Sequence, residues 1–275
     1  MIGFLPTETE GTELFYRFNY ANNATATVII HHGFGEHLGR FDHVADYLLE
    51  SGYNVMRFDV RGHGLTKGPK GRVDTWERFI EDMDRIYALT KELSGHLPIF
   101  TLGHSMGGMI TLMYGLYAPE NLQGQVFTGA ASGELPYIQG KAPRMLLKKG
   151  DEHFPGTMFP NIVKDDVCSD PEVVEAYLND PLVLKKVGFD FLKAFLIDSP
   201  KYINEHIQEY TLPILILHGE EDKVVPVELS ERLYARVASE DKTFKAYPNL
   251  YHEILNEKEH PFILAEIVYW LDKRH

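Results

Sequence analysis

Short apolar segments rich in β-branched residues alternate with segments of helical period along most of this 275-residue chain. Residues 26–31 (ATVIIH) indicate a strand, and residues 41–52 place their apolar side chains on one helical face before Gly52 ends it. Pairs of this kind are typical of crossover connections between parallel strands. We therefore predict an α/β fold with a mostly parallel sheet and helices on both of its faces.

The same alternation continues further along the chain. A long amphipathic segment at 74–95 indicates a helix with Asp74 or Thr75 as its N-cap. The further strands that we predict lie within 53–64, 98–105, 124–130, 213–222 and 242–248, and the further helices within 106–120, 228–238 and 261–274.

The alternation lapses between about Gly133 and Tyr210. This stretch contains apolar clusters and segments rich in proline and glycine, and a loop of such length without structure is uncommon in a compact domain. We therefore predict an inserted helical cap at 134–210, which divides a core formed by 1–133 and 211–275.

The chain carries 27 basic and 40 acidic residues, which give a formal net charge of -13 at pH 7. This charge repels nucleic acid at long range, so we expect no nucleic-acid partner. Residues 141–150 (KAPRMLLKKG) are a basic exception, in which lysine and arginine surround apolar side chains. The segment is either a solvated helix face or a part of the cap that makes transient contact with a lipid–water interface.

Cys168 is the only cysteine, so no intrachain disulfide can form and a reducing compartment is the simpler expectation. The first residues lack a basic segment followed by a long apolar one, and no window reaches the roughly 18 apolar residues of a membrane helix. We expect a cytoplasmic protein.

The segment GHSMGG at 103–108 interrupts a long apolar run. Only Gly103, His104 and Ser105 separate an apolar strand from an apolar helix, so Ser105 must occupy a sharp turn. Gly103 and Gly107 let the two backbones approach each other, and the helix N-terminus favours the negative charge of an oxyanion. In isolation the motif fits an ordinary glycine-rich turn, but between this strand and this helix it predicts Ser105 as a catalytic nucleophile.

A serine nucleophile requires a histidine base that is oriented by a carboxylate. In the α/β-hydrolase arrangement these partners follow the nucleophile in the order acid, histidine, on loops after late strands. Asp222 and His252 satisfy both conditions, and we predict them as the acid and the base. Glu220 and Glu221 remain alternatives for the acid, with Asp198 in the cap as a weaker one. The alternative for His252 is an exposed loop position.

The segment HEILN at 252–256 has a superficial likeness to a zinc motif. That motif needs a second histidine at its fifth position, where this chain has Asn256. We therefore predict no metal site, and no other motif indicates a cofactor.

The oxyanion of a tetrahedral intermediate needs two converging N–H donors. We predict one from Met106, the residue after the nucleophile, and one from Phe34, in the loop after an early strand. Gly33 and Gly35 allow the backbone of this loop to turn the Phe34 amide towards Ser105.

Other polar residues near these strand ends have no part in this scheme. For Arg61 and His63 we favour a structural role that braces neighbouring loops, and for His104 a packed position beside the turn. We expect His32 to pack beneath the loop that carries Phe34, and an ordinary polar position near a turn is the alternative for His31, His32 and His37.

Several sequence blocks carry a resemblance to a known family. They are 31–41 (HHGFGEHLGRF), 58–68 (FDVRGHGLTKG), 102–108 (LGHSMGG), and 217–226 (LHGEEDKVVP) with 251–257 (YHEILNE). The chain resembles the serine α/β-hydrolases of the monoacylglycerol lipase and lysophospholipase group. The first two blocks are more specific than the serine motif alone, since they separate this group from most other hydrolases of the fold.

The resemblance implies an α/β-hydrolase fold in which a helical cap covers an apolar acyl tunnel. It also implies a triad and an oxyanion hole, formed by Ser105, Asp222 and His252 and by the amides of Phe34 and Met106. The chain departs from the group at Thr66, where serine is usual, and at 131–136 (ASGELP), where a short turn with serine and proline is common.

We predict a serine hydrolase that cleaves carboxylic ester bonds of monoacylglycerol or lysophospholipid-type lipids through an acyl-enzyme intermediate, with a small acyl ester as its ligand. A small-ester or hydroxycinnamoyl carboxylesterase would share the core and differ in the cap. A proline-type aminopeptidase would need an acidic anchor for an amine, such as Glu134 or the pair Asp151 and Glu152. A non-catalytic binding protein on this scaffold is a further alternative, but such proteins tend to lose members of the triad.

Overall fold

The computed structural model describes residues 1–138, 140–153, 156–161, 163 and 166–275. These residues contain an eight-stranded sheet in the order β1-β2-β4-β3-β5-β6-β9-β10. The strands from β4 to β10 in this order are parallel, whereas β2 is antiparallel to both β1 and β4. Their bounds are β1 Ile2–Pro6, β2 Glu13–Asn19, β3 Ala26–His31, β4 Tyr53–Phe58, β5 Ile99–His104, β6 Gly124–Thr128, β9 Ile214–Gly219 and β10 Lys242–Tyr247.

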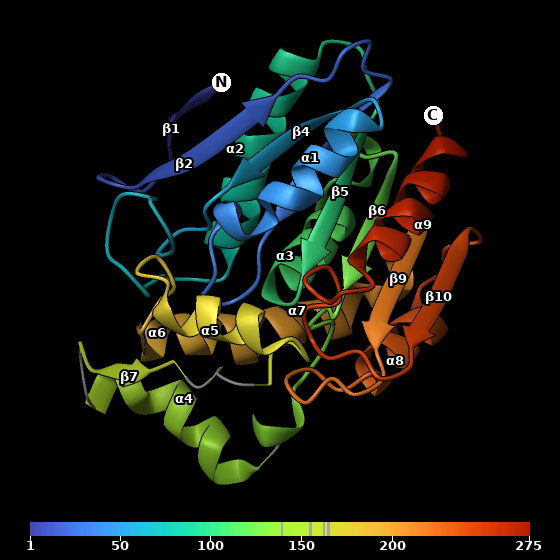
Figure 1. Cartoon of the computed structure of the whole chain (residues 1–275). Coiled ribbons are helices and arrows are strands. Elements are labelled where there is room, and N and C mark those ends of the chain that lie inside the picture. Colours follow the sequence, from blue (N-terminus) through green and yellow to red (C-terminus); the bar gives the residue numbers. More distant parts are fainter. Residues whose placement is uncertain (139, 154–155, 162, 164–165) are drawn as a thin grey trace.

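Helices cover both faces of this sheet, as predicted (Figure 1). On one face α1 (Asp42–Glu50) and α9 (His260–Asp272) pack against it, and on the other face α2 (Glu77–Ser94), α3 (Met106–Tyr117) and α8 (Glu228–Arg236) do so. Alternate residues of β3 point into the two hydrophobic cores, because successive side chains of a strand face opposite sides. In the described parts of the chain, no helix combines the length and the apolar character of a membrane span.

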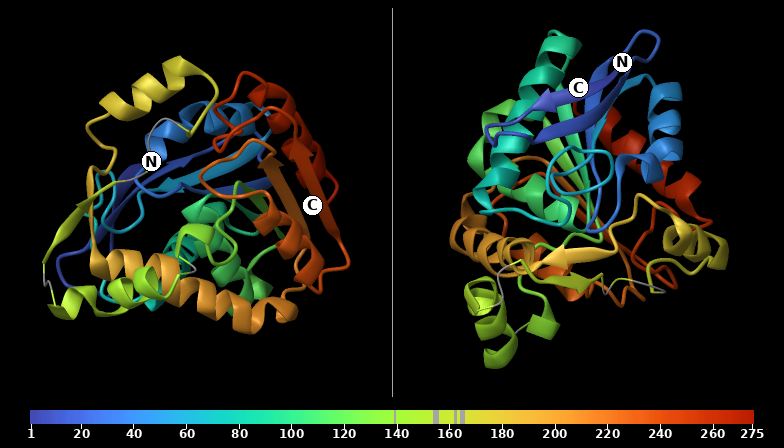
Figure 2. Two further views of the ribbon diagram at one scale, coloured as in Figure 1. Left: turned by 90° about the horizontal axis from the view of Figure 1, so that it is seen from below. Right: turned by 90° about the vertical axis from the view of Figure 1, so that its left-hand side faces the viewer.

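The segment between β6 and β9 lies at the carboxyl ends of the parallel strands (Figure 1). Seen from below, α5 and α7 lie on opposite sides of these strand ends (Figure 2). The segment is mostly helical, as predicted, but it also contains an antiparallel pair of three-residue strands, too short for a periodic pattern. Its elements are η3 Pro136–Ile138, α4 Lys141–His153, β7 Met158–Pro160, α5 Pro171–Asn179, β8 Lys186–Gly188, α6 Phe189–Lys193, the π-helix η4 Ala194–Asp198, α7 Ser199–His206 and η5 Ile207–Glu209. The division into core and cap at 134–210 stays a prediction.

Two local features differ from the sequence-based expectations. β1 and β2 were not predicted, and β1 is a sheet edge in which exposed and half-buried residues alternate. The predicted N-cap of α2 is wrong, since the helix begins at Glu77 with Trp76 as its N-cap. Asp74 instead accepts a hydrogen bond from Arg78 at 3.2 Å. The remaining short helices are η1 Leu38–Phe41 and η2 Pro119–Asn121.

Candidate active site

Ser105 lies at a sharp turn between β5 and α3, where the sequence predicted it. Its backbone has φ 54° and ψ -118°, a conformation that residues with a side chain rarely adopt. A Cβ atom on Gly107 would lie 2.2 Å from the carbonyl oxygen of His31, and one on Gly103 would lie 2.7 Å from that of Gly107. Glycine at both positions therefore permits the close packing of β5, α3 and β3 that this turn requires.

His252 and Asp222 form a hydrogen-bonded pair in the loops after β10 and β9. Nδ1 of His252 lies 2.6 Å from Oδ2 of Asp222, and both side chains are buried. The other carboxylate oxygen of Asp222 accepts two bonds of 2.8 Å from the backbone N–H groups of Val224 and Val225. The carboxylate is thus held by its own loop, and it fixes the proton of His252 on Nδ1.

The other acids considered from the sequence lie elsewhere. Glu220 and Glu221 are both exposed. Asp198 belongs to η4 and pairs with Lys193 at 3.2 Å. The geometry therefore favours Asp222 as the carboxylate that orients His252.

His252 also lies beside the serine turn. Its ring centroid is 4.7 Å from that of His104, the residue before Ser105. Gly129 leaves room for the ring, because a Cβ atom there would be 3.1 Å from Nδ1 of His252. The fold thus brings the three predicted residues to one end of the sheet, each of them less than a tenth exposed. The hydrogen bond from the Ser105 hydroxyl to Nε2 of His252 stays a prediction.

A second histidine, His218 at the end of β9, contacts the same carboxylate and was not predicted. Its Nε2 lies 3.0 Å from Oδ2 of Asp222 and 2.8 Å from the carbonyl oxygen of Val225. Nδ1 lies 2.7 Å from the hydroxyl of Ser230. Because a carbonyl oxygen only accepts hydrogen bonds, Nε2 of His218 carries a proton and donates. The sequence signal was the position of His218 at a strand end, four residues before Asp222.

Electrostatics shift the pKa values of this pair in opposite directions. Burial by itself lowers the pKa of His252, but the charge of Asp222 and their hydrogen bond outweigh burial and raise it above the ordinary value of 6.5. Burial raises the pKa of Asp222, but His252 and His218 bring it well below its usual range. Asp222 is therefore ionised at neutral pH, and it favours the imidazolium form of His252.

This pKa shift predicts the acid limb of the pH profile. A general base must be neutral to accept a proton, so kcat/KM rises as pH rises through the pKa of His252. Because that pKa is raised, we expect the midpoint of the limb above pH 6.5. The measurement is kcat/KM for a p-nitrophenyl ester at constant ionic strength. A midpoint at or below pH 6.5 would contradict the charge effect of Asp222.

The loop after β3 lies against the serine turn. A Cβ atom on Gly33 would be 3.0 Å from Cβ of Ser105, and Gly35 has φ 80°. Phe34 is therefore close to Ser105, and Met106 is the first residue of α3. These positions are compatible with two N–H donors on one oxyanion, and the role of both amides stays a prediction.

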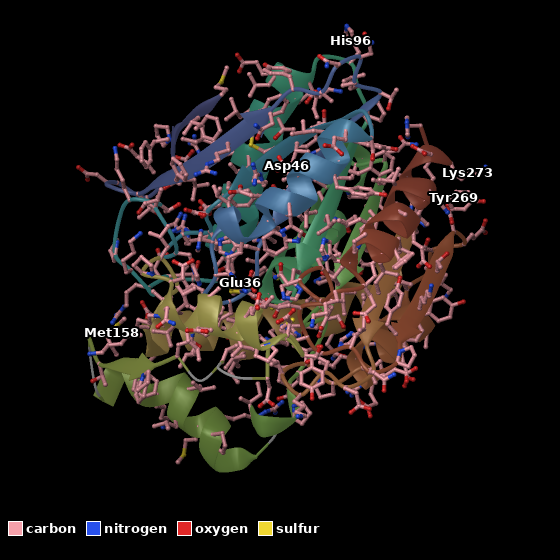
Figure 3. The ribbon with its side chains drawn as sticks, in the orientation of Figure 1. Glu36, Asp46, His96, Met158, Tyr269 and Lys273 are labelled. Carbon is pink, nitrogen blue, oxygen red and sulfur yellow. The ribbon has the colours of Figure 1, made fainter. Side chains whose placement is uncertain are left out.

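A buried charged cluster, which the sequence did not predict, lies next to His252. Arg40 donates to both carboxylate oxygens of Glu253 at 2.5 and 2.8 Å and lies 3.5 Å from Glu36. Figure 3 shows Glu36 in the interior, near the helices of the segment between β6 and β9. Burial and the charge of Glu253 raise the pKa of Glu36 to about 8. Burial raises the pKa of Glu253, but the charge and hydrogen bonds of Arg40 outweigh burial and bring this pKa below its ordinary value. Glu253 therefore adds negative charge beside His252.

Arg61, His63 and His104 have structural contacts, as predicted. Arg61 donates two bonds of 2.6 Å to Asp82 of α2, and both side chains are buried. The ring of His63 packs edge-on to that of Phe34, with centroids 6.0 Å apart. Nδ1 of His104 is hydrogen-bonded to the backbone of β6. These residues support the loops around the serine turn.

The remaining predicted positions are also buried in the structure. Nε2 of His32 accepts a bond of 2.9 Å from the N–H of Val60, which holds two loops together. His37 pairs with Asp180 at 2.8 Å, and the ring of His31 packs against β4. Thr66, which replaces a usual serine, uses its hydroxyl to donate to the carbonyl oxygen of residue 59 at 2.6 Å.

The fold and this site together define a class of protein. A mostly parallel eight-stranded sheet, a serine at a strained turn from strand to helix, and an aspartate and histidine on later loops are the parts of an α/β-hydrolase. Comparison with known proteins agrees, because residues 22–259 match the family described as "Serine aminopeptidase, S33".

Individual relatives show which group within this family the chain resembles. The chain is 36% identical to a monoacylglycerol lipase of Mycolicibacterium smegmatis over 249 residues, which cover 89% of this chain and 87% of the relative. It is 28% identical to a phospholipase of Bacillus subtilis, over 87% of this chain and 92% of the relative. The crystal structure of a Paleococcus ferrophilus monoacylglycerol lipase superposes with a TM-score of 0.85 at 27% identity, covering 96% of this chain and 100% of that one. The chain belongs to the matched family and, within it, to the monoacylglycerol lipase group of α/β-hydrolases, and it is a carboxylic ester hydrolase.

Proposed function

We propose that this enzyme hydrolyses monoacylglycerol or lysophospholipid-type esters through an acyl-enzyme on Ser105. The observation that carries the proposal is the buried Asp222–His252 pair beside a serine in a strained turn. His252 accepts the proton of Ser105 as its oxygen attacks the ester carbonyl, and Asp222 stabilises the imidazolium. The amides of Phe34 and Met106 bind the oxyanion. The alcohol leaves with that proton, and water then releases the acid.

Apolar side chains near Phe34 support a long acyl chain as part of the substrate. The ring of Phe34 stacks on Phe195 with centroids 5.7 Å apart and lies 5.8 Å from that of Phe191. Both partners belong to the proposed cap at 134–210, so the cap brings apolar surface to the predicted oxyanion hole. The relatives that carry the names monoacylglycerol lipase and phospholipase point to the same class of substrate.

A series of glycerol monoesters tests this proposal. We expect kcat/KM to rise by up to about fourfold for each methylene from acetyl to decanoyl, since burying one methylene contributes about 0.8 kcal/mol. The assay measures released acid by pH-stat titration, with methyl ferulate and an aminoacyl amide as comparison substrates. A series that is flat or falls with chain length would contradict the lipid assignment and favour a small-ester or hydroxycinnamoyl carboxylesterase.

The family description makes an aminopeptidase the second candidate to weigh. That activity needs a free carboxylate for the amine of the substrate. Glu134, one predicted anchor, forms an ion pair with Arg144, and the side chains of Asp151 and Glu152 lie outside the described residues. The ion pair of Glu134 and the relatives named monoacylglycerol lipase and phospholipase therefore favour ester over amide hydrolysis.

We also propose transient contact between α4 and a lipid–water interface. Met145 and Leu146 are 62% and 50% exposed, next to the basic Arg144. The side chains of Lys141 and Lys148, which the sequence placed in the same patch, lie outside the described residues. A cytoplasmic location and the lack of a nucleic-acid partner stay predictions, supported by the single cysteine and the net charge of -13.

A further inference from the structure

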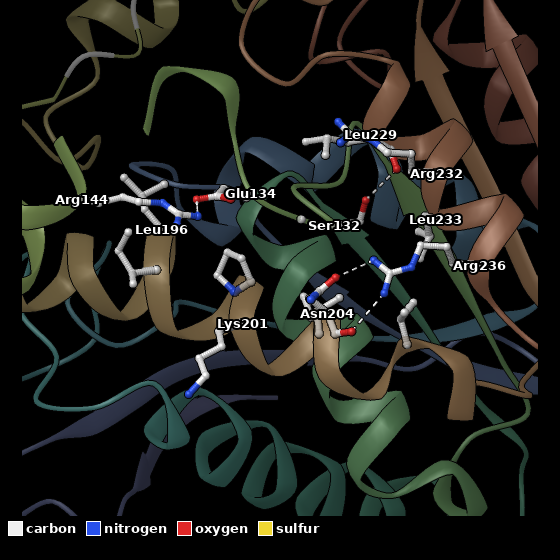
Figure 4. A pocket seen from close by; sticks show the side chains of 15 residues that line it. Ser132, Glu134, Arg144, Leu196, Lys201, Asn204, Leu229, Arg232, Leu233 and Arg236 are labelled. Atoms are coloured by element: carbon white, nitrogen blue, oxygen red, sulfur yellow. Dashed lines mark hydrogen bonds and ion pairs between the residues drawn. The ribbon is translucent and has the colours of Figure 1, made fainter. Parts of the chain in front are cut away.

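A cavity of 380 Å³ lies between α7 and α8, beside the segment that follows β6 (Figure 4). Among the described residues, those that line it do not include Ser105, Asp222 or His252. The cavity nevertheless begins next to the serine turn, because Ala131 donates its N–H to the carbonyl oxygen of Ser105 and Ser132 lines the cavity. Its apolar wall is formed by Leu196, Ile203, Ile207, Leu229 and Leu233.

The charged part of the described lining is mostly basic, although the chain as a whole has a net charge of -13. The charged lining residues are Arg144, Lys201, Arg232 and Arg236 with the single acid Glu134. Arg144 is paired with Glu134, and Lys201 lies 3.9 Å from Glu205 outside the cavity. Among the described lining residues, the basic side chains that form no ion pair are Arg232 and Arg236 of α8.

The hydrogen bonds that Arg232 and Arg236 make with described residues go to neutral oxygen atoms. The two terminal nitrogens of Arg236 donate to the side-chain and backbone oxygens of Asn204 at 2.9 and 3.0 Å (Figure 4). Nε of Arg232 donates to the carbonyl oxygen of Glu228 at 3.2 Å. In the described parts of the chain, no carboxylate oxygen lies within 4.0 Å of either guanidinium group. Because the two arginines are four residues apart on one helix, they share a face and repel each other unless an anion lies between them.

We propose that this cavity binds an anionic amphiphile, with its carboxylate or phosphate on Arg232 and Arg236 and its alkyl chain on the apolar wall. A guanidinium group offers several N–H donors in one plane, which matches the oxygens of both anions. The choice of ligand rests on the proposed function, since hydrolysis of an acyl ester releases a fatty acid beside this cavity and a lysophospholipid carries a phosphate. The predicted tunnel is apolar, whereas this cavity has a cationic side.

Calorimetric titration of the Ser105→Ala variant tests the proposal without turnover. The ligands are decanoate, decyl phosphate and the neutral 1-decanoylglycerol, each below its aggregation concentration. In the same background, Arg232→Gln with Arg236→Gln removes the two charges. The matched control is Lys91→Gln with Lys273→Gln, which removes two exposed charges elsewhere; Figure 3 shows Lys273 near the C-terminal end of α9.

We expect the arginine double variant to weaken binding of decanoate or decyl phosphate by about tenfold or more, and binding of 1-decanoylglycerol by less than twofold. The control should bind all three as the parent does. The anion whose affinity falls more in the arginine double variant identifies the source of the ligand. A larger fall for decanoate indicates a released fatty acid, and a larger fall for decyl phosphate indicates a phosphate head group. Equal affinity of the arginine variant and the control for both anions would overturn the proposal. Hydrolysis of 1-decanoylglycerol by the arginine variant with Ser105 intact would still support the proposed function in that case.

Discussion

Replacement of Ser105 with alanine is expected to lower kcat by about 10⁴- to 10⁶-fold, the loss seen when the nucleophile of a triad is removed. The remaining residues can still orient the substrate, but no acyl-enzyme forms. Stability should change little, because the Ser105 side chain makes no hydrogen bond that caps α3. Alanine also meets the same constraint as serine at φ 54°. The measurements are kcat on a p-nitrophenyl ester and the Tm.

Ser51→Ala is a matched control, since it also removes one serine hydroxyl, at the end of α1. In the parent this hydroxyl donates to the carbonyl oxygen of Tyr47. This variant should keep full activity. A fluorophosphonate probe should label the parent and the control, and leave Ser105→Ala unlabelled. Activity of Ser105→Ala within tenfold of the parent would show that another residue is the nucleophile.

The serine turn could be predicted because its signals are local. Only three residues join the strand to the helix, and Gly103 and Gly107 lie two residues on either side of Ser105, so the backbone has little choice of conformation. The structure shows a strained φ at Ser105. The partners were predicted from chain order and strand ends. Chain order and position after a strand do not separate Asp222 from Glu220 and Glu221. In the structure Asp222 contacts His252, whereas the two glutamates are exposed.

The features that were missed depend on burial, which a single sequence does not reveal. His218 is an ordinary strand residue in the sequence, but it is fully buried against the acid of the pair. Glu36, Arg40 and Glu253 come from segments more than 200 residues apart and form one cluster only in the folded chain. The basic side of the cavity could not be predicted for the same reason. It forms only when the segment between β6 and β9 folds and brings α7 against α8.

Asp222→Asn is expected to lower kcat by about 10⁴-fold, because it reverses the tautomer of His252. The N–H groups of Val224 and Val225 both point at one carboxylate oxygen, so the amide oxygen of asparagine must take that position. Its NH₂ group then occupies the place of Oδ2, 2.6 Å from Nδ1 of His252. An NH₂ group only donates, so Nδ1 loses its proton and Nε2 carries it. A protonated Nε2 cannot accept the proton of the serine.

The same NH₂ group faces a second donor, which makes the substitution costly for stability as well. Nε2 of His218 carries a proton, since it donates to the carbonyl oxygen of Val225, and in the variant it would meet the NH₂ group at the 3.0 Å now spanned by a hydrogen bond. The second N–H of the asparagine would then have no acceptor, and because a buried donor without an acceptor costs about 1–3 kcal/mol, the Tm should fall. His218→Leu is the comparison, because leucine has no hydrogen-bond donor and the substitution leaves the Asp222–His252 pair intact. A variant Asp222→Asn with kcat within tenfold of the parent and an unchanged Tm would mean that neither histidine depends on this carboxylate, and the assignment of Asp222 as the acid would have to be given up.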